Sequence, residues 1–252
     1  MALCVITGGA GGMGIEIAKI MGKTQKLILV DCSNEKLERA KSELKKLGID
    51  SEIFVVDVCN RESIKDLVKF SKEKGDIKLV VHTAGISPGM ADAERIFEVN
   101  ALFNGTTCLK EAFKQIISSL PENYAPSAGY NISKNFVRWY TQQMAIKYSG
   151  KGIRVVSISP GVIDTPILEK SKIMSEALAK MSPLGRMGKP EEIAKIVEFL
   201  ARDECSIVVG NDLLCDGGMI NAIRAFNDQQ NLTDNMIKML QNYLGVNEIN
   251  NC

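Results

Sequence analysis

Tyr130 and Lys134 are the residues of this sequence best suited to acid–base chemistry, and they stand four positions apart in Tyr130-Asn131-Ile132-Ser133-Lys134. On a helix this spacing places a phenol and an ammonium on one face. A positive charge beside a phenol favours the phenolate and lowers the phenol pKa, which is the shift that a general base needs near neutral pH. The pair therefore predicts proton transfer, although an isolated pair at this spacing also occurs by chance.

A second chemical signal is the glycine-rich stretch from Thr7 to Gly14, which reads Thr-Gly-Gly-Ala-Gly-Gly-Met-Gly. It directly follows a short apolar run and precedes a segment with helical periodicity. Glycines allow a tight turn there and let the backbone approach a pyrophosphate, while the helix N-terminus offers free N–H groups. We expect the phosphates of a dinucleotide to contact Gly8, Gly11, Gly12, Met13 and Gly14.

Asp31 closes the second apolar run, 17 residues after Gly14. A carboxylate at this point can accept hydrogen bonds from both hydroxyls of the adenine ribose and repels a 2′-phosphate. No lysine or arginine lies in Gly9–Gly11 or immediately after Asp31 to receive such a phosphate. The sequence therefore favours NAD over NADP. As an N-cap for a helix that starts near Asn34, Asp31 is poorly spaced.

The elements that must position these residues are short Val- and Ile-rich runs that alternate with longer helical segments. Several runs are apolar on both faces, as expected when helices cover both sides of a parallel sheet. The alternating order predicts an α/β, single-domain Rossmann fold with a doubly wound sheet. We expect strands at 2–7, 26–31, 52–57, 78–82, 115–118, 154–159 and 212–215. We expect helices at 13–21, 34–47, 61–74, 93–113, 130–148 and 190–201.

Composition excludes several classes of function. Lysine plus arginine (31) balance aspartate plus glutamate (30), so the chain offers no field for nucleic acid or an anionic membrane. No apolar run approaches the ~18 residues of a membrane span, and the N-terminus lacks the basic region of a signal peptide. The seven cysteines are odd in number and form no C-x-x-C pair, which argues against a disulfide framework or a zinc knuckle. We expect a cytoplasmic protein with reduced cysteines.

Taken in order, the motifs resemble those of the short-chain dehydrogenase/reductase family, from residue 2 to about residue 219. The family's T-G-x-x-x-G-x-G matches Thr7 to Gly14, and its Y-x-x-x-K matches Tyr130 and Lys134. Further similar segments are Asp57-Val58, Ala84-Gly85, Ser159-Pro160-Gly161, Thr165-Pro166, 183–194 and Asp216-Gly217-Gly218. The family usually has Asn-Asn before Ala-Gly, where this chain has His82-Thr83.

The resemblance implies a seven-stranded parallel sheet in the order 3-2-1-4-5-6-7 and a role for each matching residue. Tyr130 would exchange a proton with the substrate oxygen, Lys134 would bind the nicotinamide ribose, and Asn100 would steady a water in the proton relay. Hydride would pass directly between cofactor and substrate, and no metal is required. The implied cofactor contacts are Gly8, Gly11, Gly12, Met13, Gly14, Asp31, Cys32, Asp57, Val58, Ala84, Gly85, Tyr130, Lys134, Pro160, Gly161, Val162, Ile163 and Thr165.

One departure from the family concerns the catalytic serine. Only 30 positions separate Asn100 from Tyr130, fewer than is usual in the family. The fifth strand, which normally delivers the serine that holds the substrate oxygen, is compressed into 115–119. We choose Ser118 on spacing, with Ser119 as the alternative; a deleted loop or residues missing from the sequence would both produce this interval.

The resemblance implies an NAD(H)-dependent oxidoreductase that interconverts a secondary alcohol and a ketone. Tyr124, Ile163, Ile167, Leu168, Ile173 and Met174 suggest an apolar cleft. The overall resemblance leans toward hydroxysteroid dehydrogenases and related carbonyl reductases. The alternatives are a 3-oxoacyl-carrier-protein reductase and an inactive dinucleotide-binding sensor. We expect a homo-oligomer, a dimer or tetramer, formed through helices 93–113 and 130–148, and a tail at 227–252 compatible with a short helix over 236–244.

A serine hydrolase is the alternative that Gly85-Ile86-Ser87-Pro88-Gly89 offers, because the segment fits the pattern G-x-S-x-G. The nucleophile elbow of such enzymes needs a helix directly after the serine, and Pro88-Gly89 indicate a loop. The only histidine, His82, precedes Ser87, whereas an α/β-hydrolase places its histidine last in the chain. A single histidine also argues against the ligand set of a zinc alcohol dehydrogenase.

Overall fold

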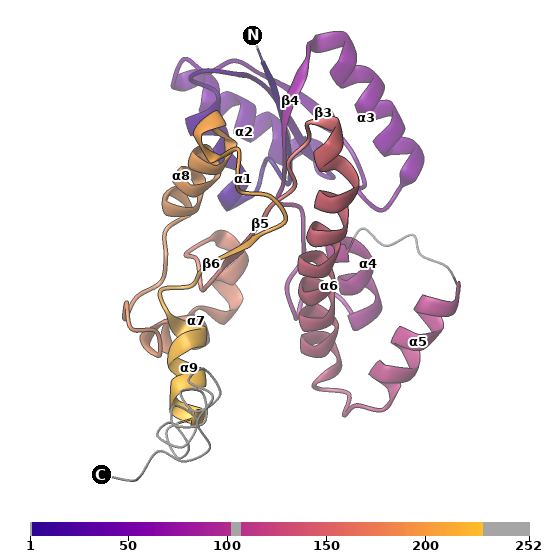
Figure 1. Cartoon of the computed structure of the whole chain (residues 1–252), viewed down its shortest axis with the longest axis vertical. Coiled ribbons are helices and arrows are strands. Elements are labelled where there is room, and N and C mark those ends of the chain that lie inside the picture. Colours follow the sequence, from indigo (N-terminus) through magenta and orange to yellow (C-terminus); the bar gives the residue numbers. More distant parts are fainter. Residues whose placement is uncertain (1, 102–106, 229–252) are drawn as a thin grey trace, which may run out of the picture.

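The first half of the chain forms a parallel four-stranded sheet in the computed structural model, which describes residues 2–101 and 107–228. Its strands are β1 (Leu3–Thr7), β2 (Lys26–Asp31), β3 (Ser51–Val55) and β4 (Ile77–His82), in the spatial order β3-β2-β1-β4. Every residue of β1 is buried, so this strand lies at the centre of the core. The carboxyl ends of all four strands meet at one edge, where Thr7 pairs with Val30 and with His82 (Figure 1).

Three helices follow the first three strands: α1 (Gly12–Met21), α2 (Asn34–Lys46) and α3 (Arg61–Lys74). Ser33 caps α2 by accepting a hydrogen bond from Lys36 N–H, and Asn60 caps α3 by accepting from Glu62 and Ser63 N–H. One face of β1 and β2 packs on α1 and α2, and the other face packs on α3 through Leu67. The sheet is therefore covered by helices on both faces, as the sequence predicts.

The second half supplies long helices and a separate pair of strands. Helix α8 (Pro190–Ala201) packs closely on α1 and contributes Ala194 to the core beside α1 and α2. This contact attaches the second half of the chain to the first half. Short 3-10 helices span Ser149–Lys151, Pro166–Ser171 and Asp203–Cys205. The regular elements are α4 (Ala93–Ala101), α5 (Thr107–Ser118), α6 (Ala125–Tyr148), β5 (Ser157–Pro160), α7 (Lys172–Lys180), α8 (Pro190–Ala201), β6 (Asp212–Cys215) and α9 (Met219–Asp228).

The prediction of seven strands in one sheet is wrong for the described residues. Strands β5 and β6 pair only with each other, and the segment 115–118, expected as the fifth strand, is the last turn of α5. The reason is local packing. Phe113 and Ile117 stand four residues apart and pack in one cluster with Phe97, with the rings of Phe97 and Phe113 stacked at 4.4 Å between centroids. Ile116 is left 52 % exposed on the helix surface, which a buried central strand would not allow.

Other boundaries move by a few residues. The helix expected over 93–113 is described as α4 and α5, with 102–106 outside the described residues. Helix α6 begins five residues earlier than expected, because Pro126 suits the first turn of a helix. Helices α7 and α9 were not predicted, and α9 crosses the boundary expected between 226 and 227. The tail segment 236–244 lies outside the described residues.

Candidate functional site

The turn between β1 and α1 is built so tightly that only glycine fits at two of its positions. Gly8 has a φ of 68°, and a Cβ there would lie 2.7 Å from the backbone nitrogen of Ala84. A Cβ on Gly14 would lie 2.2 Å from the carbonyl oxygen of Gly8. The turn thus folds back on α1 while it touches the segment that follows β4, which brings two of the predicted cofactor segments together.

The N-terminus of α1 is free to receive an anion. No side chain caps the helix at Gly11, and its first turn carries no acidic residue. The partial positive charge of the helix end and its N–H groups at Gly12, Met13 and Gly14 therefore lie at the carboxyl edge of the sheet without an acidic or capping side chain. These features fit a pyrophosphate at this turn.

Asp31 lies at the same edge, at the end of β2. Its Oδ1 accepts hydrogen bonds from the backbone N–H of Ser33 at 3.3 Å and from the thiol of Cys32 at 3.6 Å. Burial, followed by the negative charge of Asp31, raises the pKa of the Cys32 thiol, so the thiol is neutral near pH 7. The position of the carboxylate fits the hydroxyls of an adenine ribose next to the glycine turn.

Asp57 and Val58 follow β3 at the same edge of the sheet. The Oδ1 atom of Asp57 accepts a hydrogen bond from the backbone N–H of Cys59 at 2.9 Å, and Oδ2 lies 3.7 Å from a guanidinium nitrogen of Arg95. Val58 packs against the core cluster on the α3 side of the sheet. Arg95 thereby links α4 to the loop after β3, a contact that sequence reasoning did not identify.

Tyr130 and Lys134 lie on the first half of α6, with the Lys134 Nζ atom 5.4 Å from the centre of the Tyr130 ring. The same ammonium lies 3.6 Å from the point where a Cβ on Gly85 would stand. Burial raises the pKa of Tyr130 and lowers the pKa of Lys134. The expectation of a depressed phenol pKa is therefore not met in the protein alone, because removal of the phenol from water favours its neutral form.

Asn100 is buried, and its side-chain amide ties three elements together. Its Oδ1 accepts from the backbone N–H of Ile86 at 2.8 Å, and its Nδ2 donates to the Ile86 carbonyl at 3.0 Å and to the Ser133 hydroxyl at 3.3 Å. Ser133 in turn donates to the Tyr130 carbonyl at 2.7 Å. Ser133 was not predicted as a site residue, although its place one helical turn after Tyr130 puts it on a related face.

His82 ends β4 beside this group. Its Nδ1 atom lies 2.5 Å from the Thr7 hydroxyl. Desolvation by the surrounding protein and then the positive charge of Lys134 lower the pKa of His82 below its ordinary value of 6.5, so the ring is neutral at pH 7. A neutral imidazole here joins the ends of β1 and β4 without adding charge near Lys134.

The predicted nicotinamide segment follows β5. Gly161 donates its N–H to the carbonyl of Cys215 at 3.0 Å, and the buried Ile163 bridges to Gly188. From there the loop turns toward α1, and the Cβ of Thr165 lies 3.1 Å from the point where a Cβ on Gly12 would stand. Thr165 thus lies beside the glycine turn at the end of this loop.

The predicted catalytic serine is not delivered by a strand. Ser118 is exposed at the end of α5, where its hydroxyl donates to the carbonyl of Lys114. Ser119 donates to the carbonyl of Ile116 at 2.7 Å. Figure 1 shows α5 apart from both groups of strands. The structure therefore corrects the placement of both serines, because the segment that carries them continues a helix.

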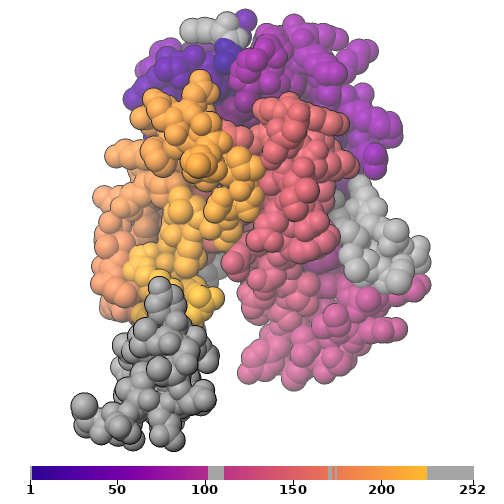
Figure 2. Space-filling view, viewed as in Figure 1, coloured from indigo at the N-terminus to yellow at the C-terminus, as the bar shows by residue number. Residues whose placement is uncertain are grey.

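The residues expected to line an apolar substrate cleft have different surroundings. Ile163 is buried, whereas Tyr124 and Ile173 are 61 % and 87 % exposed. Figure 2 shows an open cleft between the pink surface of α5 and α6 and the orange to yellow surface of the C-terminal elements. The side chain of Met174 is not among those described.

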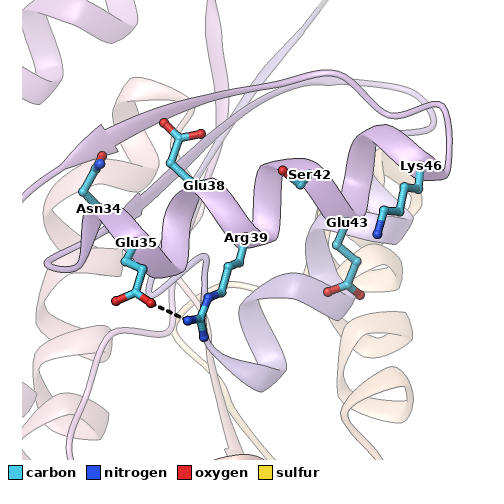
Figure 3. A pocket seen from close by; sticks show the side chains of 7 residues that line it. All are labelled: Asn34, Glu35, Glu38, Arg39, Ser42, Glu43 and Lys46. Atoms are coloured by element: carbon cyan, nitrogen blue, oxygen red, sulfur yellow. Dashed lines mark hydrogen bonds and ion pairs between the residues drawn. The ribbon is translucent and has the colours of Figure 1, made fainter.

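A separate surface hollow of about 930 Å³ lies along α2 (Figure 3). The Glu35 carboxylate and the Arg39 guanidinium in it form an exposed ion pair within the helix. This hollow is charged and solvated, and it contains none of the predicted catalytic residues. Its lining consists of Asn34, Glu35, Glu38, Arg39, Ser42, Glu43 and Lys46.

The described residues contain no helix long and apolar enough to cross a membrane. Within 2–101 and 107–228, no three His, Cys, Asp or Glu side chains are grouped so that they could hold a metal ion. The geometry instead brings a glycine turn, a helix N-terminus, a strand-end carboxylate and a tyrosine–lysine pair to one sheet edge. That combination defines a dinucleotide-binding Rossmann protein with a candidate proton-transfer group.

Comparison with known proteins extends this description. Residues 2–116 match the family model described as KR domain, and residues 115–220 match the one described as Enoyl-(Acyl carrier protein) reductase. The chain is 32 % identical over 240 residues to the 3-oxoacyl-[acyl-carrier-protein] reductase FabG of Thermotoga maritima, covering 86 % of this chain and 97 % of the relative. It is 31 % identical over 237 residues to a cyclopentanol dehydrogenase of Comamonas sp., covering 85 % and 95 %. The crystal structure of levodione reductase superposes with a TM-score of 0.72 at 26 % identity, covering 86 % of this chain and 96 % of that one.

The chain belongs to the short-chain dehydrogenase/reductase family, whose members are oxidoreductases that bind nicotinamide dinucleotides. The Rossmann fold predicted from the sequence is confirmed, and residues 2–101 and 107–228 contain fewer strands than the seven expected.

Proposed function

We propose that this protein is an NAD(H)-dependent oxidoreductase that interconverts a secondary alcohol and a ketone. The observation that carries the proposal is the meeting of Tyr130, Lys134 and Asn100 with the segment that begins at Gly85, beside the glycine turn. Proton transfer needs a donor or acceptor beside the carbon that exchanges hydride, and Tyr130 is the phenol at this edge of the sheet. The dinucleotide supplies the hydride acceptor or donor when it is bound.

Each residue of this group has a role in the proposal. The Tyr130 phenol gives a proton to the ketone oxygen in reduction and takes it from the alcohol in oxidation. The Lys134 ammonium holds a ribose hydroxyl of the nicotinamide half and favours the phenolate. The buried Asn100 amide fixes the backbone at Ile86 and, through Ser133, the helix that carries Tyr130. The Asn100 role in steadying a relay water is part of the proposal.

The preference for NAD rests on Asp31. Its carboxylate at the end of β2 accepts hydrogen bonds from Ser33 and Cys32 and so stays at the sheet edge next to the glycine turn. A 2′-phosphate on the ribose would meet this negative charge, whereas two ribose hydroxyls would donate to it. The remaining implied contacts, from Gly8 to Thr165, complete the proposed cofactor site.

The substrate class that we propose is a small apolar ketone or its alcohol, a hydroxysteroid among the candidates. Relatives named cyclopentanol dehydrogenase and levodione reductase support a cyclic carbonyl compound. The relative named 3-oxoacyl-[acyl-carrier-protein] reductase supports an acyl thioester as the second candidate. Both candidates share the same hydride and proton transfers.

A cofactor-binding protein without catalysis is the competing function, and one observation favours it. Neither Ser118 nor Ser119 lies on a strand, and both hydroxyls are bonded to carbonyls of their own helix turn. A substrate oxygen would therefore depend on Tyr130 for its positioning.

The experiment that tests the proposal follows reduced-nicotinamide absorbance at 340 nm while the purified protein meets NAD or NADP and a panel of substrates. The panel contains cyclopentanol, hydroxysteroids and, in the reverse direction, cyclic ketones and a 3-oxoacyl thioester. NAD-dependent turnover that disappears in Tyr130→Phe supports the proposal. NADH binding without turnover of any substrate would favour the competing function.

We also propose a homo-oligomer that forms through the helices α4 and α6. Trp139, Tyr140 and Ile146 of α6 are 53 %, 47 % and 79 % exposed, which favours a contact with a second copy. Light scattering that gives the mass of a monomer would contradict the oligomer.

The domain that we propose for catalysis is 1–226, and the proposed tail is 227–252.

A further inference from the structure

A carboxylate that is almost fully enclosed stands where α6 meets the pair β5–β6. Asp212, the first residue of β6, has a side chain only 10 % exposed. Its Oδ1 accepts hydrogen bonds from the hydroxyls of Ser157 at 2.6 Å and Ser159 at 2.9 Å, and its Oδ2 accepts from Ser159 at 2.8 Å. The Nε atom of Arg138 lies 2.9 Å from the same Oδ2.

The two strands and the helix are each placed for this contact. Ser157 and Ser159 are two residues apart on β5 and therefore share one face, and Ser157 is the register partner of Asp212. Arg138 lies one turn beyond Lys134 and two turns beyond Tyr130 on α6, so all three side chains follow one side of the helix. The group of Arg138, Ser157, Ser159 and Asp212, here the Asp212 clip, joins that side to both strands.

The clip matters because, among the described residues, no main-chain strand pairing holds β5 and β6 against the rest of the fold. Strands β5 and β6 form a sheet of their own, and no ladder connects them to β4. Figure 2 shows the surface of α6 meeting that of the C-terminal elements above an open cleft. An enclosed carboxylate held by three polar side chains resists displacement more than an apolar contact, because its separation from Arg138 would leave a buried charge without its counter-ion.

The clip also joins the two elements that carry the two parts of the candidate site. Tyr130 and Lys134 project from α6, whereas Pro160 to Thr165 continue directly from β5 toward Gly12. The relative position of α6 and β5 therefore sets the relative position of the phenol and the nicotinamide segment. A misplacement of about 1 Å between reacting groups can lower a rate by ~10²-fold.

We propose that Asp212 is a positioning residue, which holds α6 through Arg138 so that Tyr130 and Lys134 face the loop that follows β5. This inference rests on the proposed function and adds to it a set of residues outside the proposed cofactor contacts and the proposed proton-transfer group. Ser157 and Ser159 hold the carboxylate in place, and Arg138 transmits its position to the helix.

The test compares Asp212→Asn, Arg138→Met and Arg138→Lys with the unchanged protein. The matched control is Arg202→Met, which removes a guanidinium from an exposed ion pair with Glu198 at 3.2 Å. We expect Asp212→Asn and Arg138→Met to lower kcat by about tenfold or more, while the NADH dissociation constant changes by less than about threefold. Arg138→Lys keeps the charge and should recover part of the rate, and the control should leave kcat unchanged.

The double variant Asp212→Asn with Arg138→Met separates a shared function from two independent ones. If the two residues act through one contact, the double variant should lose no more activity than the more impaired single variant. Losses of kcat that multiply would contradict the proposal. So would a lowered melting temperature with an unchanged kcat and an unchanged pH profile, because that result describes a contact that only stabilises the fold.

A readout without turnover keeps this inference separate from the proposed function. The phenol of Tyr130 can be titrated by absorbance at 295 nm as the difference between the protein and Tyr130→Phe. Burial raises its pKa, so release of α6 should lower the Tyr130 pKa toward its ordinary value in Asp212→Asn and not in Arg202→Met. Absence of turnover in the unchanged protein overturns the proposed function, and an unmoved Tyr130 titration overturns the positioning role.

Discussion

At the residue scale, Tyr130 carries two opposing influences that act on the same proton. The Lys134 ammonium at 5.4 Å from the ring favours the phenolate, and burial of the phenol favours the neutral form. Burial has the larger effect, so the pKa of Tyr130 lies above its ordinary value of 10.0 in the protein without cofactor. Near neutral pH the phenol is therefore protonated, so it donates a proton more readily than it accepts one.

This balance predicts opposite pH dependences for the two directions of the reaction. Ketone reduction uses the protonated phenol, which persists up to the raised pKa, so its rate should stay level through pH 7 to 9. Alcohol oxidation uses the phenolate, whose fraction rises tenfold per pH unit below the pKa, so its rate should increase over the same range. Initial rates in both directions measure this, and an oxidation rate that is level from pH 7 to 9 would contradict it.

The Tyr130→Phe variant supplies the reference for these profiles. Removal of the hydroxyl should lower kcat by ~10²- to 10⁴-fold, because proton transfer by a positioned group contributes that range. The NADH dissociation constant should change little, since the ring is retained. A variant that keeps a tenth or more of the activity would assign the proton to another group.

Asp31 gives a prediction about cofactor choice. Loss of charge-assisted hydrogen bonds in Asp31→Ser should weaken NAD binding by ~10- to 100-fold, which corresponds to ~1.4–2.7 kcal/mol. Binding of NADP should improve or stay constant, because the repulsion of its phosphate is removed. Fluorescence titration with NADH and NADPH measures both, with the exposed Asp50→Ser as control. Equal weakening for both cofactors would contradict the assignment.

At the element scale, the end of α8 depends on a side chain from outside the helix. Arg154, which lies just before β5, donates from one nitrogen to the carbonyls of Leu200 at 2.9 Å and Cys205 at 3.2 Å, and from the other to Arg202 at 3.2 Å. The last carbonyls of a helix have no partner within the helix, and a cation there also opposes the negative end of the helix dipole. Arg154 thus joins α8 to β5.

Replacement of Arg154 by Met should lower the free energy of unfolding by ~1–3 kcal/mol, because several carbonyls lose a charged donor. Urea unfolding followed by circular dichroism measures the change. Arg202→Met, which removes only an exposed ion pair, should change the free energy by less than ~1 kcal/mol. Equal effects of the two substitutions would contradict the assigned role of Arg154.

The start of α8 gives a pH dependence. Glu192 accepts from the Lys189 backbone N–H at 2.7 Å and pairs with both terminal nitrogens of Arg186 at 2.9 and 2.8 Å. The hydrogen bond from Arg186 and then that from Lys189 N–H lower the pKa of Glu192 to about 2. A depressed carboxylate stabilises the fold fully above its ordinary pKa of 4.5, and this contribution is lost as the pH falls toward 2.

Glu192→Gln should therefore lower the melting temperature at pH 7 by about 1–2 °C, a small amount because the pair is exposed. The difference between the variant and the unchanged protein should shrink as the pH is lowered from 4.5 to 3. Thermal unfolding at pH 7, 4.5 and 3 measures this. A difference that stays constant down to pH 3 would mean that the carboxylate charge is not involved.

At the scale of the whole molecule, the division of the strands into four and two changes which residues are buried. Val80 in β4 is 61 % exposed, whereas Ile28, which pairs with the same β1 residue from β2, is fully buried. Val80→Thr should therefore change the free energy of unfolding by less than ~0.5 kcal/mol, and Ile28→Ala should lower it by ~2–5 kcal/mol. A loss of more than ~1 kcal/mol in Val80→Thr would show that a further segment covers β4 in solution.

The sequence by itself determined the features that depend on local spacing. The glycine turn lies between β1 and α1, and Asp31 ends β2, as predicted. Tyr130 and Lys134 stand four residues apart on one helix, also as predicted. Strands β1, β2 and β4 were predicted almost to the residue, because each is a short run rich in Val, Ile and Leu whose end carries a turn signal. These patterns are fixed by backbone geometry and hold wherever the segment packs.

Only the tertiary structure decided the features that depend on distant partners. The segment 115–118 has the composition of a strand. It is helical because Phe113 and Ile117, one helical turn apart, pack in one cluster with Phe97 of α4. Ser118 is therefore at the end of a helix and not on a strand. The raised pKa of Tyr130 follows from burial, which no interval in the sequence reveals. The Asp212 clip joins residues 74 positions apart whose meeting depends on the pairing of β5 with β6. A short apolar segment takes the secondary structure that buries it best, and that choice belongs to its neighbours in space.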